Sequence, residues 1–265
     1  MEKKSGKVNS KDGTTIAYDR RGSGPAVILV DGALCYRGFG PMATLADLLA
    51  PHFTVYNYDR RGRGESSNSK PFSVQHEIED IDALIEEAGG KAFLYGISSG
   101  GCLSLEAALK LGSKMEKLAV YEAIYVIDKT ATQAWKDYRK QLETYLQEGR
   151  RGDAVTLFMQ FVGTPADQVA GMRNAPMWSM FEAVAPTLAY DAAAVGDDRL
   201  VPEKRMAKVK PTTMVLNGTV TPLIPEADAR LAEAIPHAQH RVLEGQPHDV
   251  NLELLASVLT PFFVQ

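Results

Sequence analysis

One serine stands in the middle of a glycine-rich stretch, YGISSGGC, at residues 95–102. Gly96 and Gly100 lie two positions before and two positions after Ser98. Small residues at this spacing permit a sharp turn from a strand into a helix, which holds the serine oxygen exposed. Such a serine can act as a nucleophile when a histidine and a carboxylate stand beside it. The backbone N–H of Ser99, at the start of the helix, is placed to stabilise an oxyanion.

The chain has five histidines, and only one of them follows a predicted strand and precedes a predicted helix. That residue is His248, in the segment GQPHDVN. His52, His237 and His240 come just before strands, at the opposite end of the sheet, and His76 lies in the first turn of a helix. A histidine can take up and return a proton near neutral pH, so we predict His248 as the general base.

Short apolar runs alternate with segments of helical periodicity at both ends of the chain. Glycines, charged residues and helical patterns separate these apolar runs. The runs are therefore predicted to be strands that are buried on both faces. The alternation predicts an α/β fold with a doubly wound, mainly parallel sheet covered by helices on both faces. The predicted strands cover residues 14–22, 26–32, 53–59, 91–97, 117–127, 212–218 and 240–245.

The interval 128–208 interrupts the alternation. It contains helical patterns such as WKDYRKQLETYL and DAVTLFMQFV but no convincing strand. We therefore expect a single domain over residues 1–265, with a helical insertion, or lid, at 128–208 lying over the sheet. The insertion is rich in large apolar side chains, of which Met159 and Trp178 are candidates for contact with a substrate.

The composition excludes several classes of protein. Hydrophobic residues make up 45% of the 265 residues, the formal net charge is −4 and the basic residues are scattered, which argues against nucleic acid as a partner. No apolar run approaches the ~18 residues needed to cross a bilayer, and the polar N-terminus is not a signal peptide. Cys35 and Cys102 match no metal-ligand spacing. We expect a cytoplasmic monomer or small homo-oligomer with no cofactor and no metal.

Four segments together resemble the α/β-hydrolase superfamily. They are VILVDG, YDRRGRGES, GISSG and QPHDVN, which match the oxyanion loop, the D-x-R-G-x-G-x-S loop, the nucleophile elbow and the histidine loop. The oxyanion loop of the family usually begins His-Gly, whereas here it begins Asp31-Gly32. The resemblance implies that the backbone N–H of Ala33 forms the oxyanion hole with that of Ser99, with Leu34 as a second candidate donor.

The position of the catalytic acid departs from the common family pattern. Most members carry it as G-x-x-D after the next-to-last strand, where this chain reads Gly218-Thr219-Val220-Thr221. Some members, including the zearalenone lactone hydrolases, place the acid after the preceding strand, and Glu122 stands at that position here. The resemblance thus implies Glu122 as the acid, while Asp128 and Glu226 stay open as alternatives.

A serine at the elbow favours acyl transfer over the reactions of relatives that use aspartate there. We expect hydrolysis of a small to medium, mostly apolar ester or lactone, with Leu34, Tyr36, Met159 and Trp178 against the substrate. One alternative is a cofactor-free perhydrolase, haloperoxidase or C–C hydrolase on the same three residues. Another is a non-catalytic binding protein on a hydrolase scaffold, which the missing G-x-x-D favours.

Overall fold

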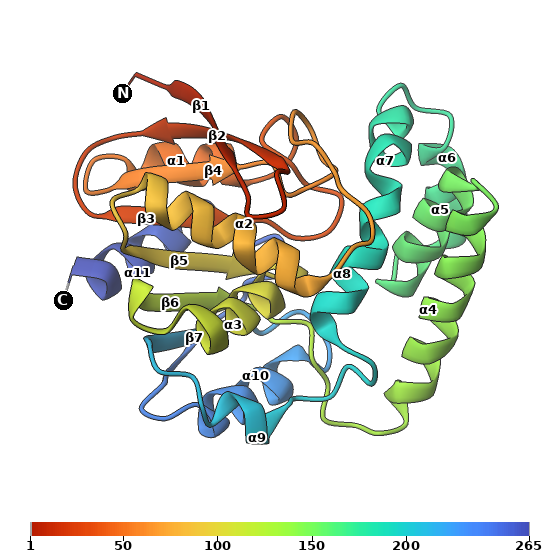
Figure 1. Cartoon of the computed structure of the whole chain (residues 1–265). Helices are drawn as coiled ribbons and strands as arrows, with labels where there is room; N and C mark the ends of the chain where they lie inside the picture. Colours follow the sequence, from red (N-terminus) through yellow and green to blue (C-terminus); the bar gives the residue numbers. More distant parts are fainter. Residues whose placement is uncertain (1, 265) are drawn as a thin grey trace.

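The computed structural model describes residues 2–264, which form an eight-stranded sheet with helices on both faces (Figure 1). The strand order is β1-β2-β4-β3-β5-β6-β7-β8; β2 runs antiparallel to β1 and β4, and the later pairs are parallel. The predicted doubly wound, mainly parallel fold is confirmed. The strands are β1 (Lys4–Asn9), β2 (Thr15–Arg21), β3 (Ala26–Val30), β4 (Thr54–Tyr58), β5 (Ala92–Ile97), β6 (Met115–Tyr121), β7 (Thr212–Gly218) and β8 (Gln239–Leu243).

Successive residues of the central strands face two separate hydrophobic cores. In β5, Leu94 packs into one core, whereas Phe93, Tyr95 and Ile97 pack into the other. Since both faces of the strand are buried, its sequence is apolar without a gap. The first core lies under α2 (Val74–Glu87), α3 (Ser99–Leu111) and α10 (Ile224–Ala234), and the second under α1 (Met42–Leu49) and α11 (Leu252–Val264).

The chain between β6 and β7 is helical, and these helices lie within the predicted interval 128–208. Figure 1 shows α4 to α8 beside the end of the sheet toward which the parallel strands point, with α8 nearest the sheet, whereas α9 lies next to α10. No helix among the described residues is long and apolar enough to cross a membrane. The helices of the insertion are α4 (Ala131–Gln147), α5 (Arg151–Phe161), α6 (Ala166–Met172), α7 (Trp178–Val184), α8 (Leu188–Val195) and α9 (Glu203–Met206).

Two features of the fold differ from the sequence-based expectation. The strand predicted at 117–127 ends at Tyr121, because Glu122 adopts a positive φ of 46° that an extended chain does not contain. The polar segment at the N-terminus contains strand β1, which was not predicted. This edge strand pairs only with β2 and is exposed or half-buried throughout, so it carries no apolar signal.

Candidate active site

Ser98 lies in a strained turn between β5 and α3. Its φ of 59° and ψ of −129° fall in a region that non-glycine residues rarely adopt. A Cβ atom at Gly96 would overlap the Ser104 hydroxyl, and one at Gly100 would overlap the Val30 carbonyl oxygen. Both positions therefore require glycine. The Ser98 N–H donates to the Tyr121 carbonyl oxygen at 3.0 Å, which anchors the turn to the neighbouring strand β6.

The chain places Glu122 directly against His248. Ile97 and Tyr121 are paired in the sheet register, so the residues that follow them, Ser98 and Glu122, leave adjacent strands at the same level. Glu122 is fully buried, and its Oε2 lies 2.6 Å from Nδ1 of His248, in the loop between β8 and α11. A carboxylate at Nδ1 holds the imidazole in one orientation and leaves Nε2 free to accept a proton.

The last residue of β7, Gly218, contributes a backbone donor to the same carboxylate. The Gly218 N–H donates to Glu122 Oε1 at 3.1 Å, so each oxygen of Glu122 has one partner. Asp128 is exposed and accepts hydrogen bonds from Thr130, and Glu226 is exposed in the first turn of α10. Neither alternative acid is hydrogen-bonded to His248 among the described residues. The geometry thus favours Glu122 as the partner of the imidazole.

A second buried carboxyl group, on Asp228 of α10, lies close enough to Glu122 for their charges to interact. Neither of its oxygens has a hydrogen-bond partner among the described residues. Burial, with the charge of Glu122 as the lesser cause, raises the pKa of Asp228 well above its usual value.

The predicted oxyanion loop approaches Ser98 closely at Gly32. A Cβ atom at this glycine would lie 3.2 Å from Ser98 Cβ and 3.7 Å from Ser98 Oγ. The Gly32 N–H donates to Asp31 Oδ1 at 2.8 Å and so is already used. The N–H groups of Ala33 and Ser99 have no acceptor among residues 2–264, which leaves both free to donate to an oxyanion.

Asp31, the residue that replaces the usual histidine, is buried beneath this loop. Its Oδ2 has no hydrogen-bond partner in the described part of the chain. Burial raises the pKa of Asp31 to about 7, and the Gly32 N–H and the charges of Arg63 and Arg60 oppose that rise. The pKa of Asp31 thus lies well above the usual value of a carboxyl group and close to neutral pH.

Asp31→Asn should remove one pH-dependent contribution to stability. Because the native pKa of Asp31 is raised, its contribution is full at low pH and is lost as pH rises toward 7. Relative to Asp31→Asn, the wild type should lose about 3 kcal/mol of unfolding free energy between pH 5 and pH 8. Urea unfolding of both proteins across this range tests it, and parallel pH profiles would contradict it.

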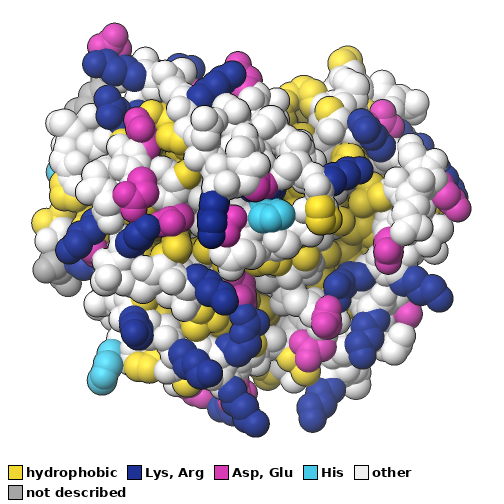
Figure 2. Space-filling model, in the orientation of Figure 1, with side chains coloured by type: hydrophobic (Ala, Val, Ile, Leu, Met, Phe, Trp, Pro, Cys, Tyr) yellow, Lys and Arg dark blue, Asp and Glu magenta, His cyan; other side chains and the backbone are white. Residues whose placement is uncertain are grey.

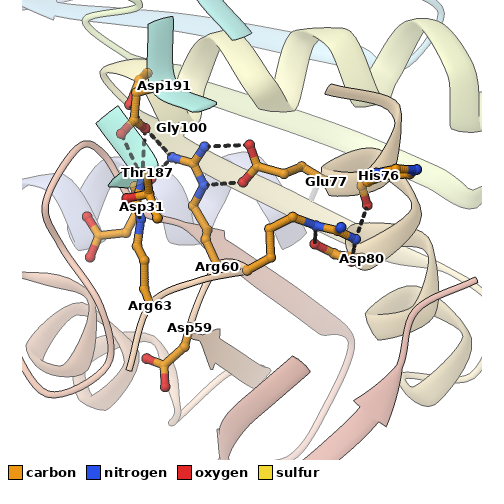
Figure 3. Close-up of polar contacts among 12 residues, drawn as sticks. Asp31, Asp59, Arg60, Arg63, His76, Glu77, Asp80, Gly100, Thr187 and Asp191 are labelled. Carbon is orange, nitrogen blue, oxygen red and sulfur yellow. Dashed lines mark hydrogen bonds and ion pairs between the residues drawn. The ribbon is translucent and has the colours of Figure 1, made fainter. Parts of the chain in front are cut away.

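Arginines from the loop after β4 form a buried ionic cluster around Asp191 of α8 (Figure 3). Nη2 of Arg63 lies 2.9 and 2.8 Å from the two Asp191 oxygens, and Nη1 of Arg60 lies 2.6 Å from Oδ1. The Ser99 hydroxyl donates to the same Oδ1 at 2.8 Å. Burial alone would raise the pKa of Asp191, but Arg63, Arg60 and Ser99 hold it below its usual value.

The same two arginines hold the oxyanion loop by its backbone. Nη1 of Arg63 donates to the carbonyl oxygens of Gly32 at 2.5 Å and Cys35 at 3.0 Å, and Nη1 of Arg60 donates to that of Asp31 at 3.2 Å. Arg60 is also paired with Glu77. Asp191 thus joins the helical insertion to both parts of the predicted oxyanion hole.

Sequence reasoning missed Asp191 because no motif surrounds it on α8. The one available signal was the density of arginine in the loop DRRGRGE, since three buried guanidinium groups require carboxylates from elsewhere in the chain. The guanidinium group of Arg61 donates hydrogen bonds to the carboxylates of Asp80 and Asp12. The partner of Arg63 is 128 residues away, and local sequence does not identify it.

The predicted substrate-binding residues differ in accessibility. Leu34, Met159 and Trp178 are buried, and the Trp178 indole N–H donates to Glu182 within the insertion. Tyr36 is partly exposed, and its ring lies 6.3 Å from that of Phe39. On the face drawn in Figure 2, hydrophobic side chains gather along the boundary between the sheet and the insertion. Contact of these four residues with a substrate stays a prediction.

Within residues 2–264 there is no group of three or more His, Cys, Asp or Glu side chains that could hold a metal ion.

Comparison with known proteins identifies the family that the sequence motifs resemble, and the match covers most of the chain. The family model described as "Alpha/beta hydrolase family" matches residues 22–256. An uncharacterized hydrolase of Bacillus subtilis, YraK, is 30% identical over 119 residues, which are 42% of this chain and 42% of that protein. The chain is thus matched to less than half the length of this relative.

Solved structures extend the similarity to the whole chain. An alpha/beta hydrolase from Sphaerobacter thermophilus is 48% identical and superposes with a TM-score of 0.87, covering 97% of this chain and 100% of its own. An enol-lactonase from Burkholderia xenovorans, 20% identical with a TM-score of 0.72, shares the fold over 98% of this chain and 100% of its own. The chain therefore belongs to the alpha/beta hydrolase family, which confirms the enzyme family predicted from the sequence.

Proposed function

We propose that this protein is a serine hydrolase that cleaves a small to medium, mostly apolar ester or lactone through an acyl-enzyme on Ser98. The observation that carries the proposal is the 2.6 Å contact between Glu122 Oε2 and His248 Nδ1, one strand away from Ser98 at the strained turn. Glu122 is the acid, His248 the base, and the N–H groups of Ala33 and Ser99 form the oxyanion hole.

The reaction proceeds in two acyl-transfer steps. The Ser98 oxygen attacks the carbonyl carbon while its proton passes to Nε2 of His248, and the oxyanion accepts hydrogen bonds from the two N–H groups. Glu122 stabilises the imidazolium. His248 then protonates the leaving oxygen, and the C–O bond breaks. Water attacks the acyl-enzyme and gives one proton to His248. The bond to the Ser98 oxygen then breaks, His248 returns the proton to that oxygen, and the carboxylic acid departs.

The substrate class rests on the character of the surrounding side chains. The insertion contributes aliphatic side chains together with aromatic residues and methionines, which favour an apolar acyl or alcohol group. An ester is cleaved into two molecules, whereas a lactone opens to a single hydroxy acid, and the same residues perform both reactions.

Covalent labelling tests the nucleophile directly. A fluorophosphonate should add to the wild type stoichiometrically, and Ser98→Ala should abolish the adduct seen by intact mass, because the variant lacks the oxygen that forms the bond to phosphorus. Ser99→Ala is the matched control: it should still be labelled, since its backbone N–H is retained. An unlabelled wild type would reject the hydrolase proposal and favour a binding protein, and a label that persists in Ser98→Ala would reject Ser98.

A further inference from the structure

Arg199, on the segment between α8 and α9, is a partly buried arginine without a carboxylate partner among the described residues. Its Nε donates to the Ile124 carbonyl oxygen at 2.6 Å. The nearest carboxylates in sequence are engaged elsewhere: Asp197 pairs with Arg139 at 2.7 Å, and Asp198 accepts a backbone N–H two residues further along. The outer nitrogens of the guanidinium group thus have no acceptor within residues 2–264.

The guanidinium group lies between the carboxyl end of β6 and the helical insertion. Ile124 is only two residues beyond Glu122, so this contact is at the same end of the sheet as Ser98. The central carbon of the group stands 5.8 Å from the ring of Trp135 and 5.5 Å from the ring of Phe161. We expect a substrate that reaches Ser98 beneath the insertion to approach this layer, because Arg199 and Ser98 lie at the same end of the sheet.

Backbone strain sets Arg199 apart in the same way as the catalytic candidates. Its φ is 61°, and six non-glycine residues of the described chain have a positive φ. Three of the others are Leu34, Ser98 and Glu122, which all belong to the candidate active site. Strained residues persist where surrounding structure holds them and cluster at sites of function.

The environment of Arg199 leaves part of its charge uncompensated. Burial lowers the pKa of Arg199, and no carboxylate opposes this effect. The aromatic rings of Trp135 and Phe161 offset part of the desolvation cost through cation–π contact. A bound anion would offset the rest and would accept hydrogen bonds from the free nitrogens, for which a planar carboxylate has the matching geometry.

We propose that Arg199 binds a carboxylate on the substrate, so that the preferred substrates are mostly apolar esters or lactones with an anionic group remote from the scissile bond. This inference rests on the proposed function, and it adds the recognition of one negative charge. The apolar part of the substrate contacts the insertion, while the charged end reaches Arg199.

A matched pair of esters tests the inference. The 4-nitrophenyl ester of hexanoic acid and the mono-4-nitrophenyl ester of adipic acid have the same chain length and differ by a terminal carboxylate. The wild type should prefer the adipate ester. Arg199→Met should lower kcat/KM for that ester by about tenfold to a hundredfold, mainly through KM, because a charge-assisted interaction is lost. The hexanoate ester should change by less than about threefold.

Two further variants separate recognition from structure. Arg139→Met removes another arginine of the insertion, one that is paired with exposed Asp197, and should leave the preference between esters unchanged. Arg199→Lys keeps the charge and should retain part of the preference even if the methionine variant folds poorly. Equal losses on both esters in Arg199→Met, or no preference in the wild type, would overturn the inference.

The two proposals can fail separately. If the wild type hydrolyses neither ester, the proposed function fails on these substrates, and free adipate then tests Arg199 by its effect on Tm. A rise in Tm with adipate in the wild type that is absent in Arg199→Met supports the carboxylate site without turnover. No rise in the wild type overturns it.

Discussion

Glu122→Gln is expected to lower kcat for ester hydrolysis by about a thousandfold or more while the fold is retained. The Gly218 N–H requires an acceptor, so the amide oxygen of the glutamine faces Gly218 and its NH2 group faces His248. Nδ1 of His248 then becomes the acceptor and the ring proton moves to Nε2. In that tautomer the imidazole cannot take the proton of Ser98. Steady-state kinetics on a 4-nitrophenyl ester measure the loss.

Three other carboxyl groups provide controls for this substitution. Asp128→Asn and Glu226→Gln change exposed residues and should leave kcat within about threefold of the wild type. Asp228→Asn replaces a buried carboxyl group that has no hydrogen-bond partner among the described residues by a group of the same shape, and it should also remain active. A large loss in Asp128→Asn or Glu226→Gln, with an active Glu122→Gln, would transfer the role of the acid to that residue.

Asp191→Asn is expected to reduce both stability and kcat. The substitution leaves the guanidinium group of Arg63 buried without a carboxylate, which costs about 3–5 kcal/mol of unfolding free energy. It also weakens the contact with Ser99 and frees the carbonyl groups that Arg60 and Arg63 position. Since the oxyanion donors are then less well placed, kcat should fall by about tenfold to a hundredfold.

Asp80→Asn is the matched control for Asp191→Asn. Asp80 is equally buried and pairs with Arg61 of the same loop at 2.7 and 2.6 Å, but it contacts neither Ser99 nor the oxyanion loop. Both variants should lose stability in urea unfolding. At a temperature where both are folded, only Asp191→Asn should lose kcat. An equal loss of kcat in the two variants would show that Asp191 affects activity only through stability.

The strained turn at Ser98 could be predicted from sequence because its requirements are local. Gly96 and Gly100 are needed for steric reasons that concern residues within a few positions of the turn and the adjacent strand. The position of His248 could be predicted for a related reason, since the order of strand, loop and helix determines the end of a parallel sheet at which a residue lies. The short apolar runs likewise predicted the strands of the sheet, because their signal lies in adjacent residues.

The partner of each buried charge could not be predicted in this way. Glu122, Asp128 and Glu226 are equivalent as residue types, and the resemblance to one branch of the family favoured Glu122 without excluding the others. The choice among them follows from the end of β6 at Tyr121 and from the distance between two loops 126 residues apart. The β1 strand escaped prediction because an exposed edge pairs through its backbone, which leaves little trace in side-chain pattern.

The sequence by itself therefore determined the family, the parallel sheet, the nucleophile turn and the candidate base, because backbone conformation and strand order depend on local residue types. Only the tertiary structure decided that Asp191 joins the insertion to the oxyanion loop and that Arg199 has no carboxylate partner among the described residues. These facts depend on which side chains meet after packing. The free energy of a buried charge is set by those neighbours and not by adjacent residues in the chain.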